Sequence, residues 1–344
     1  MKEKKVLPPD IGGQAVLEGV MMRSPEAVAI AVRRPNGDIV VKCDPYVPLS
    51  KKHKWMGWPF VRGAVSFVMM LSTGMKTLND SSLMVGTVDE EPSKFEKWLS
   101  KTLGKSIDKI VMAVAIVLAV ALSFGLFIFL PALPSAWLTS IGCSPLGVNL
   151  ISGVIRIALL IGYIGLCGRI PDMRRTFQYH GSEHKTVYCH EHNLPLTPQN
   201  AQQFSTLHPR CGTSFLLITF VLSILLYSAI DYIILAITGF NIAASVPLKL
   251  LRTVVLLPLI TGISYETLKG LAHSDTKVCR MLRFPGMMLQ KLTTRQPTDE
   301  MCEVAIAAMN AAIDGHLPEG EKTPEGWVIL KKEPAQENEE EPAQ

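Results

Sequence analysis

Four long apolar stretches constrain this 344-residue chain more than any other feature of its sequence. They cover residues 109–131, 147–168, 213–238 and 246–264, and each contains at most two charged residues. About 20 apolar residues cross a bilayer as an α-helix, which satisfies its own backbone hydrogen bonds in lipid. We therefore predict an α-helical integral membrane protein with four transmembrane helices. For the fourth stretch, which carries two charges, a buried helix of a soluble domain is the alternative.

The distribution of Lys and Arg indicates how these helices are oriented. The connections at 132–146 and 239–245 contain neither residue type, whereas residues 1–108, residues 169–212 and the C-terminal part of the chain are rich in both. Basic loops stay in the cytoplasm, so we expect both termini and the 169–212 loop on that side. The N-terminus shows no signal-peptide pattern. Only Cys143 of the seven cysteines would lie outside the cytoplasm and membrane, which argues against a disulfide framework.

The segments outside the apolar stretches indicate a small α+β cytoplasmic lobe. Residues 27–42 hold two β-branched runs around an Asn-Gly pair, which is a favoured two-residue turn of a β-hairpin. Residues 59–80 are apolar but interrupted by charges, so we predict an amphipathic helix that lies either on the membrane or inside the lobe. Residues 265–315 are predicted to form a helical region, and residues 316–344 an acidic tail that is disordered apart from GWVIL at 326–330.

Five of the eight histidines fall between residues 180 and 208. His180, Glu183 and His184 form an H-x-x-E-H motif, and residues four apart share one face of an α-helix at a Cβ separation of about 5–6 Å. Two imidazoles at this spacing can bind one metal ion, as in the inverzincin arrangement. Glu183 would then act as the catalytic base toward water. Glu191 is a candidate third ligand, because eleven residues complete about three helical turns.

His208 and Cys211 are further candidate ligands, because they immediately precede the third apolar stretch and the membrane could bring them near the base of the second. A divalent metal suits these groups, and zinc in particular binds imidazole, carboxylate and thiolate without redox chemistry. The alternative is a loop whose histidines face water or form hydrogen bonds without a metal. A membrane di-iron hydroxylase would need several histidine boxes, but HxxxH occurs once and HxxHH does not occur.

Two charged residues lie deep within the apolar stretches, Arg156 in the second and Asp231 in the third. Such residues usually face the interior of a helix bundle and pair. We expect a structural ion pair between them, with a polar substrate pathway as the alternative. The net charge is +4, and basic residues cluster beside the apolar stretches at 51–55 and 169–175. This pattern favours anionic lipid, so the lipid bilayer is the expected partner and no nucleic acid is.

Several motifs are long enough to be specific: GGQAVLEGVMMRSP at 12–25, YHGSEHK at 179–185, HPRCGTSF at 208–215, SYE at 264–266 and PGMMLQKLTTRQPTDEMCEVAIAA at 285–308. Together they resemble the YqhQ-like bacterial multi-pass membrane proteins, a domain-of-unknown-function family described as predicted metal-dependent enzymes. The resemblance runs over about residues 10–313 and implies the bacterial inner membrane. The polar motif positions of the family fall on Glu18, Arg23, His180, Glu183, His184, Lys185, Glu191, His208, Arg210, Cys211 and Glu266.

These features predict a zinc-dependent hydrolase that acts on a lipid headgroup or a membrane-anchored peptide at the cytoplasmic surface. His180 and His184 would bind the metal, and Glu191, His208 or Cys211 would complete the shell. The alternative is a non-enzymatic scaffold or lipid-handling protein with a structural metal site. A structural zinc site is closed by four protein ligands, whereas a catalytic site keeps an open position. Coordination geometry therefore separates the two hypotheses.

Overall fold

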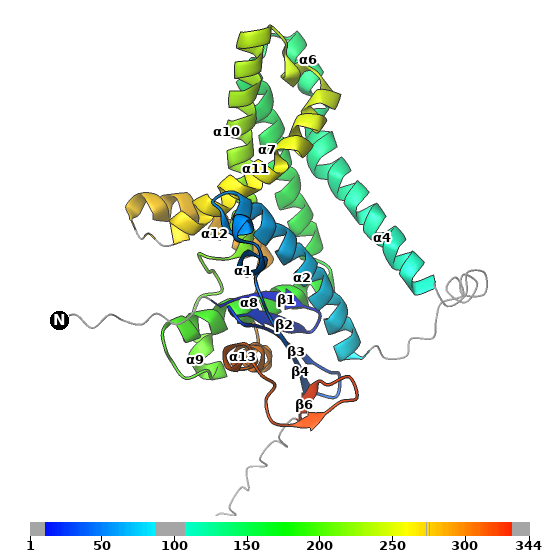
Figure 1. Cartoon of the computed structure of the whole chain (residues 1–344), viewed down its shortest axis with the longest axis vertical. Helices are drawn as coiled ribbons and strands as arrows, with labels where there is room; N and C mark the ends of the chain where they lie inside the picture. The colour runs from blue at the N-terminus through cyan, green and yellow to red at the C-terminus, as the bar shows by residue number, and fades with distance from the viewer. Residues whose placement is uncertain (1–10, 87–106, 273, 275, 332–344) are drawn as a thin grey trace, which may run out of the picture.

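The computed structural model describes residues 11–86, 107–272, 274 and 276–331 of the chain. Figure 1 shows a helical bundle with a lobe at one end, in which helices flank a six-stranded antiparallel sheet. Within these described residues, four helices are long and apolar enough to cross a membrane. The predicted fold class, four membrane-spanning helices with a small α+β lobe, is confirmed.

The lobe is built on an antiparallel sheet with the strand order β1-β2-β3-β4-β6-β5. The strands are β1 (Gly12–Val16), β2 (Gly19–Arg23), β3 (Ala27–Arg33), β4 (Ile39–Pro45), β5 (Glu321–Lys322) and β6 (Val328–Leu330). The predicted hairpin is β3–β4, with Arg33 opposite Ile39 and Gly37 in the turn at φ 93°. The sequence did not predict β1 and β2, which extend the hairpin into a meander.

The C-terminal strands correct part of the prediction for residues 316–344. Glu321–Lys322, expected within the disordered tail, form β5, and β6 lies in the GWVIL stretch that was excepted from the predicted disorder. Val40 of β4 lies opposite Ile329 of β6. Val328 is fully buried, and Trp327 packs against the core of the sheet. An apolar strand here covers the edge of β4, whose backbone groups would otherwise be unpaired. Residues 332–344 of the predicted tail lie outside the described residues.

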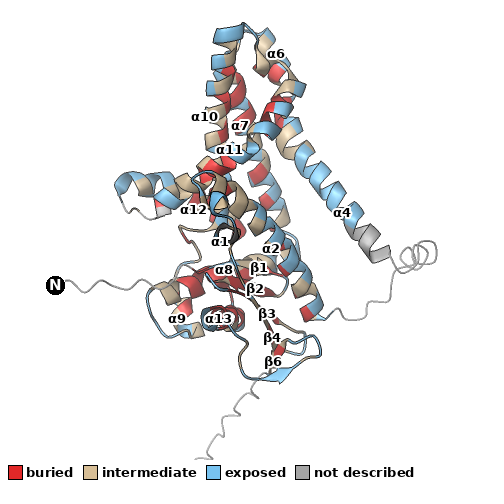
Figure 2. Cartoon of the chain, in the orientation of Figure 1, coloured by how far each residue is buried: buried red, intermediate tan, exposed pale blue. Residues whose placement is uncertain are grey.

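Helices cover both faces of the sheet, so β3 is buried along almost its whole length (Figure 2). On one face, α8 (Pro171–Glu191) contributes Tyr179 and α13 (Asp299–Asp314) contributes Met309 to a core with β2, β3 and β4. On the other face, α2 (Val61–Val85) contributes Met84. The short helix α9 (Pro198–Gln202) lies beside α8 and α13. Alternate strand side chains point to opposite faces, which is how one strand contributes to two cores.

Three candidate spans pack together, and in Figure 1 the beginning of the first span, α4 (Ile107–Phe124), stands apart from them. The packed helices are α7 (Pro145–Cys167), α10 (Gly212–Thr238) and α11 (Val246–Ala272). The first span comprises α4 (Ile107–Phe124), the π-helical turn η3 (Gly125–Phe129), α5 (Leu130–Ala132) and α6 (Ser135–Ser140). The remaining helices of the described residues are α1 (Leu49–Lys52), η1 (Lys54–Gly57), η4 (Ile242–Ala244) and α12 (Lys277–Thr293).

The charged residues inside the bundle do not pair as predicted. Asp231 accepts hydrogen bonds from Arg252 and, at 2.8 Å, from Asn149, so the expected pair between Arg156 and Asp231 is wrong. The helices α7 and α10 are antiparallel neighbours, and the seven residues from Asn149 to Arg156 rise about 10 Å along α7. This rise carries Arg156 past Asp231 to Ser223, whose Oγ lies 3.5 Å from its NH1.

The lobe is joined to the bundle where α2 crosses α11. A Cβ atom at Gly262 would overlap the carbonyl group of Phe60, so the two helices touch through backbone. Beside this contact, the Arg62 guanidinium donates to both carboxylate oxygens of Glu266 at 2.6 and 2.5 Å. The close approach fixes α2 against the end of the span nearest the lobe.

The packing of α13 gives the first prediction. Met309 is fully buried beneath the sheet, whereas Ile313 on the same helix is 41% exposed. Met309→Ala should lower the free energy of unfolding by about 2–5 kcal/mol, because it removes buried surface and leaves a cavity. Ile313→Ala, the matched control, should change it by about 0.5 kcal/mol. Circular dichroism during thermal unfolding checks this, and equal melting midpoints for the two variants would contradict the packing.

Candidate metal centre

Helix α8 carries the H-x-x-E-H motif beneath the bundle. It begins at Pro171, a residue suited to the first helical turn, and ends at Glu191, just before Asn193 at φ 53°. His180 and His184 lie one turn apart, and their ring centroids are 4.4 Å apart. The helical spacing that suggested a shared ion therefore places both rings on one side of α8.

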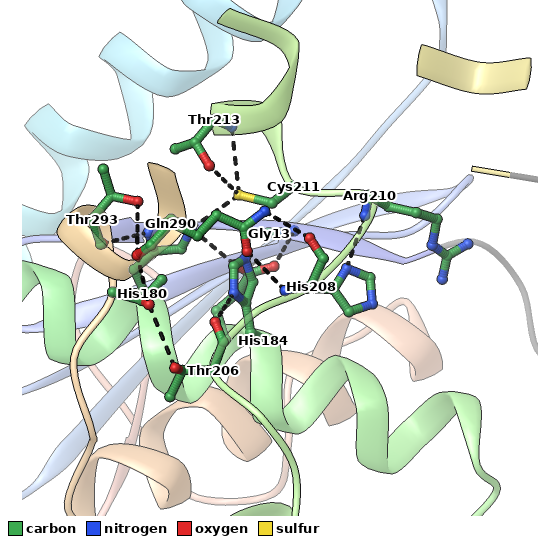
Figure 3. Close-up of polar contacts among 12 residues, drawn as sticks. Gly13, His180, His184, Thr206, His208, Arg210, Cys211, Thr213, Gln290 and Thr293 are labelled. Carbon is green, nitrogen blue, oxygen red and sulfur yellow. Dashed lines mark hydrogen bonds and ion pairs between the residues drawn. The ribbon is translucent and has the colours of Figure 1, made fainter. Parts of the chain in front are cut away.

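Cys211 joins the two imidazoles (Figure 3). One ligand atom from each of His180, His184 and Cys211 lies within 4.8 Å of the others, and His180 Nε2 is 3.3 Å from Cys211 Sγ. Around tetrahedral zinc, bonds of about 2.0–2.3 Å place ligand atoms about 3.3–3.6 Å apart. Cys211 is also the N-cap of α10, and its Sγ accepts from the backbone N–H of Thr213 at 3.5 Å. The dipole of α10 favours negative charge at that position.

Backbone carbonyls orient both imidazoles. His180 Nδ1 donates to the carbonyl oxygen of Thr293 at 2.9 Å, and His184 Nδ1 donates to that of Thr206 at 2.5 Å. A carbonyl can only accept, so the hydrogen-bond network assigns the proton to Nδ1 in both rings and leaves Nε2 with a lone pair. Hydrogen bonds of this kind are usual for histidines that bind metals.

His184 Nε2 provides a test of whether a metal fits. This atom is buried and has no hydrogen-bond partner among the described residues. An unsatisfied buried polar atom destabilises a fold, and a metal ion beside His180 and Cys211 would satisfy it. The three side chains therefore fit a divalent metal held by two imidazoles and one thiolate.

Strand β1 holds Glu183 beside these rings. The backbone N–H of Gly13 donates to Glu183 Oε1 at 3.0 Å. Its other oxygen, Oε2, lies 3.6 Å from His184 Nε2 and 3.9 Å from His180 Nε2. A Cβ atom at residue 13 would lie 2.7 Å from Glu183 Cγ, so only glycine allows the strand to approach so closely. This contact explains why residue 13 of the Gly12-Gly13 pair is a glycine.

A cavity of about 520 Å³ adjoins the candidate ligands. Its walls come from β1, β2, α2 and α8 of the lobe and from the near ends of α10 and α11. Phe67 and Met70 of α2 make part of the wall apolar, and Arg23 and Arg210 add positive charge. Apolar walls with a few placed polar groups are typical of small-molecule sites.

Glu191 does not join the metal group. Its carboxylate instead accepts hydrogen bonds from Arg210 and, at 3.1 Å, from His208 Nε2. Eleven residues restore the angular position of His180 but add about 16 Å along the helix axis, which is too far for a shared ion. Burial alone would raise the pKa of Glu191, but the hydrogen bond from His208 and the charge of Arg210 hold it below its ordinary value.

His208 lies beside the group without belonging to it. Its ring centroid is 5.6 Å from that of His184, and the imidazole lines the cavity. Gln290 of α12 fixes its backbone, since His208 N–H donates to Gln290 Oε1 and Gln290 Nε2 donates to His208 O, both at 2.8 Å. Sequence reasoning missed Gln290, Thr206 and Thr293, because backbone acceptors and a lone amide leave no metal-ligand pattern.

Five other polar residues were candidates, and three of them, Glu18, Lys185 and Glu266, lie outside the lining of the cavity. Glu18 accepts from Arg175 at 2.6 and 2.5 Å at the turn between β1 and β2. Lys185 Nζ donates to the backbone carbonyls of Phe204 at 2.6 Å and Gln202 at 3.0 Å, and burial lowers the pKa of Lys185. Glu266 holds the joint between α2 and α11. Of the five, Arg23 and Arg210 line the cavity.

Comparison with known proteins gives a family and no activity. Residues 58–315 match a family described as "Protein of unknown function (DUF1385)". The chain belongs to this family. It is 34% identical over 318 residues to "Uncharacterized protein YqhQ" of Bacillus subtilis (strain 168), which covers 89% of this chain and 93% of that relative. No solved structure matches the chain. A function for this DUF1385 member must therefore come from the chemistry of its site.

The lowered pKa of Glu191 gives a pH-dependent prediction. A carboxyl whose pKa falls on folding stabilises the fold above its unfolded pKa of about 4.3, and this contribution is lost as pH falls through the folded pKa. Glu191→Gln should therefore lower the melting midpoint at pH 7, and the difference from wild type should shrink below about pH 4. Glu321→Gln, at a carboxylate that is 62% exposed, is the control. A pH-independent difference for Glu191→Gln would contradict the assignment.

Proposed function

We propose that this protein is a metal-dependent hydrolase that acts on a lipid headgroup or a membrane-anchored peptide at the cytoplasmic surface of the bacterial inner membrane. One observation carries the proposal: His180, His184 and Cys211 converge on the wall of a cavity of about 520 Å³. Three protein ligands beside a cavity leave a coordination position open, as catalytic zinc sites require. A structural site would need a fourth protein ligand.

The donor set favours zinc as the metal. Imidazole and thiolate suit Zn²⁺, which needs no redox partner. Glu183 Oε2 lies 3.6 and 3.9 Å from the two imidazole Nε2 atoms, but Glu183 does not belong to the group of mutually close ligand atoms formed by His180, His184 and Cys211. His208, the next candidate for a fourth ligand, has its Nε2 hydrogen-bonded to Glu191. This contact supports an open site over the closed site of the scaffold alternative.

Glu183 is placed to move a proton. When bound, zinc supplies Lewis-acid activation of water near neutral pH. Gly13 holds Glu183 Oε1, and this leaves Oε2 facing the two imidazoles and the cavity. From this position, Oε2 can accept a proton from water and return it to the leaving group. Arg23 and Arg210, which line the same cavity, would favour an anionic group on the substrate.

The position of the cavity supports a substrate drawn from the bilayer. Helix α2 contributes side chains to the cavity wall, while Val68, Leu71 and Met75 on the same helix are 63%, 52% and 52% exposed. A helix with an exposed apolar face suits the boundary between headgroups and acyl chains. A cavity walled by α2 and by the ends of two spans would lie at that boundary.

Metal content tests the site. Elemental analysis of detergent-purified protein should find about one zinc ion per chain. His180→Ala/His184→Ala should reduce that content by about tenfold or more, because two of three ligands are lost. The matched control is His53→Ala/His316→Ala, which changes two exposed histidines and should keep the zinc. Equal zinc content in all three proteins would remove the site.

A second variant separates hydrolysis from a structural role. Glu183→Gln should keep the zinc but slow hydrolysis by about 10²–10⁴-fold, because the proton acceptor is lost. Product formation from bacterial total lipid extract and from a lipidated peptide, followed by mass spectrometry, measures the rate. Zinc-loaded wild type that releases no product from either would favour the scaffold alternative.

A further inference from the structure

A second polar cluster lies inside the spans, toward the end of the bundle away from the lobe. Arg156 on α7 and Lys249 and Arg252 on α11 line one cavity. Lys249 is 4% exposed and Arg252 is 8% exposed. Asp231 on α10, which is 1% exposed, contributes the carboxylate that pairs with Arg252.

Two of the three cations have no carboxylate partner among the described residues. Lys249 Nζ donates to two serine hydroxyls at 2.6 and 3.1 Å. Arg156 Nε donates to a backbone carbonyl of the first span at 2.8 Å. Asp231 therefore balances one of the three positive charges, and the other two have no carboxylate to balance them among the described residues. Unpaired charge is costly inside a membrane, and ionisable residues there usually mark a functional site.

The cavity between these cations is small. Its volume is about 20 Å³, and one buried water needs about 10–15 Å³. It can hold a monatomic ion or a water, but neither a phosphate nor a lipid headgroup. Arg252 Nε and Asp231 Oδ1 are each buried without a hydrogen-bond partner among the described residues, and Asp231 does not line the cavity. The cavity thus combines excess positive charge with a volume that fits one small ion.

We propose that this cavity binds one small anion of the halide class between Arg156, Lys249 and Arg252. The anion supplies negative charge that the described side chains lack and accepts charge-assisted hydrogen bonds. Because the donors come from α7 and α11, and Lys249 also binds Ser135 of the first span, the anion would tie these spans together. The site is separate from the proposed hydrolase centre and does not depend on it.

Anion exchange tests the proposal on the full-length protein in lipid nanodiscs. Binding of radiolabelled chloride and the thermal midpoint are measured in sodium chloride and in sodium gluconate at equal ionic strength. We expect saturable binding of about one chloride per chain, displaced by bromide, and a higher midpoint in chloride than in gluconate. Absence of saturable binding in wild type would overturn the proposal.

Variants identify the site. Arg156→Gln should weaken chloride binding by about tenfold or more, because one charged donor is lost. Arg156→Lys keeps the charge and should largely keep binding. Asp231→Asn removes the neighbouring carboxylate and should tighten chloride binding. Lys331→Gln, whose ammonium is exposed in the lobe, is the control and should change nothing.

The direction in which each variant changes chloride binding distinguishes an anion site from a purely structural cluster. A purely structural cluster would lose stability in Asp231→Asn with no change in chloride dependence. If Arg156→Gln does not fold, Arg156→Lys and Asp231→Asn still give the answer. Chloride affinity that is unchanged in Asp231→Asn and Arg156→Gln would place the ion elsewhere and overturn the assignment.

Discussion

The candidate centre depends on two hydrogen bonds from imidazole Nδ1 atoms to backbone carbonyls. His180 uses the carbonyl of Thr293 and His184 that of Thr206, and each bond sets both the ring orientation and the tautomer. Thr206 lies in the connection between α9 and α10, whereas Thr293 ends α12, 113 residues from His180 in sequence. A Cβ atom at Gly181 would overlap the Arg295 carbonyl, so glycine is needed for the segment after α12 to reach α8. The ligand atoms are therefore aligned only when the lobe and the chain around the spans are folded together.

The spans also place the third ligand. Cys211 is the N-cap of α10, so its depth is set by where that span begins. The sheet sets the position of Glu183 through Gly13 on β1. A metal at this centre would thus hold together a lobe helix, a span and the polar connection between them. The cationic cavity toward the other end of the bundle ties the spans to one another, so the chain has two polar centres with different chemistry.

Part of this arrangement could be predicted from the sequence and part could not. The apolar stretches, the hairpin and the helical spacing of His180 and His184 are local patterns, and the structure contains all of them. Assigning Glu191 as a ligand used the helical angle but neglected the axial rise. Pairing Arg156 with Asp231 neglected the register between α7 and α10, because charge alone does not say which residues lie at the same depth. The strands β1 and β2 were missed because their two-residue turn, Leu17-Glu18, lacks the Asn-Gly or Asp-Gly signature of a hairpin. The pairing of β6 with β4 joins segments far apart in sequence, which no local pattern predicts.

X-ray absorption at the zinc edge of the purified protein tests the central claim most directly. The account predicts about two imidazole nitrogens at about 2.0–2.1 Å and one sulfur at about 2.3 Å, with the sulfur shell lost in Cys211→Ser. A wild-type spectrum with nitrogen and oxygen neighbours and no sulfur would contradict a centre built from His180, His184 and Cys211.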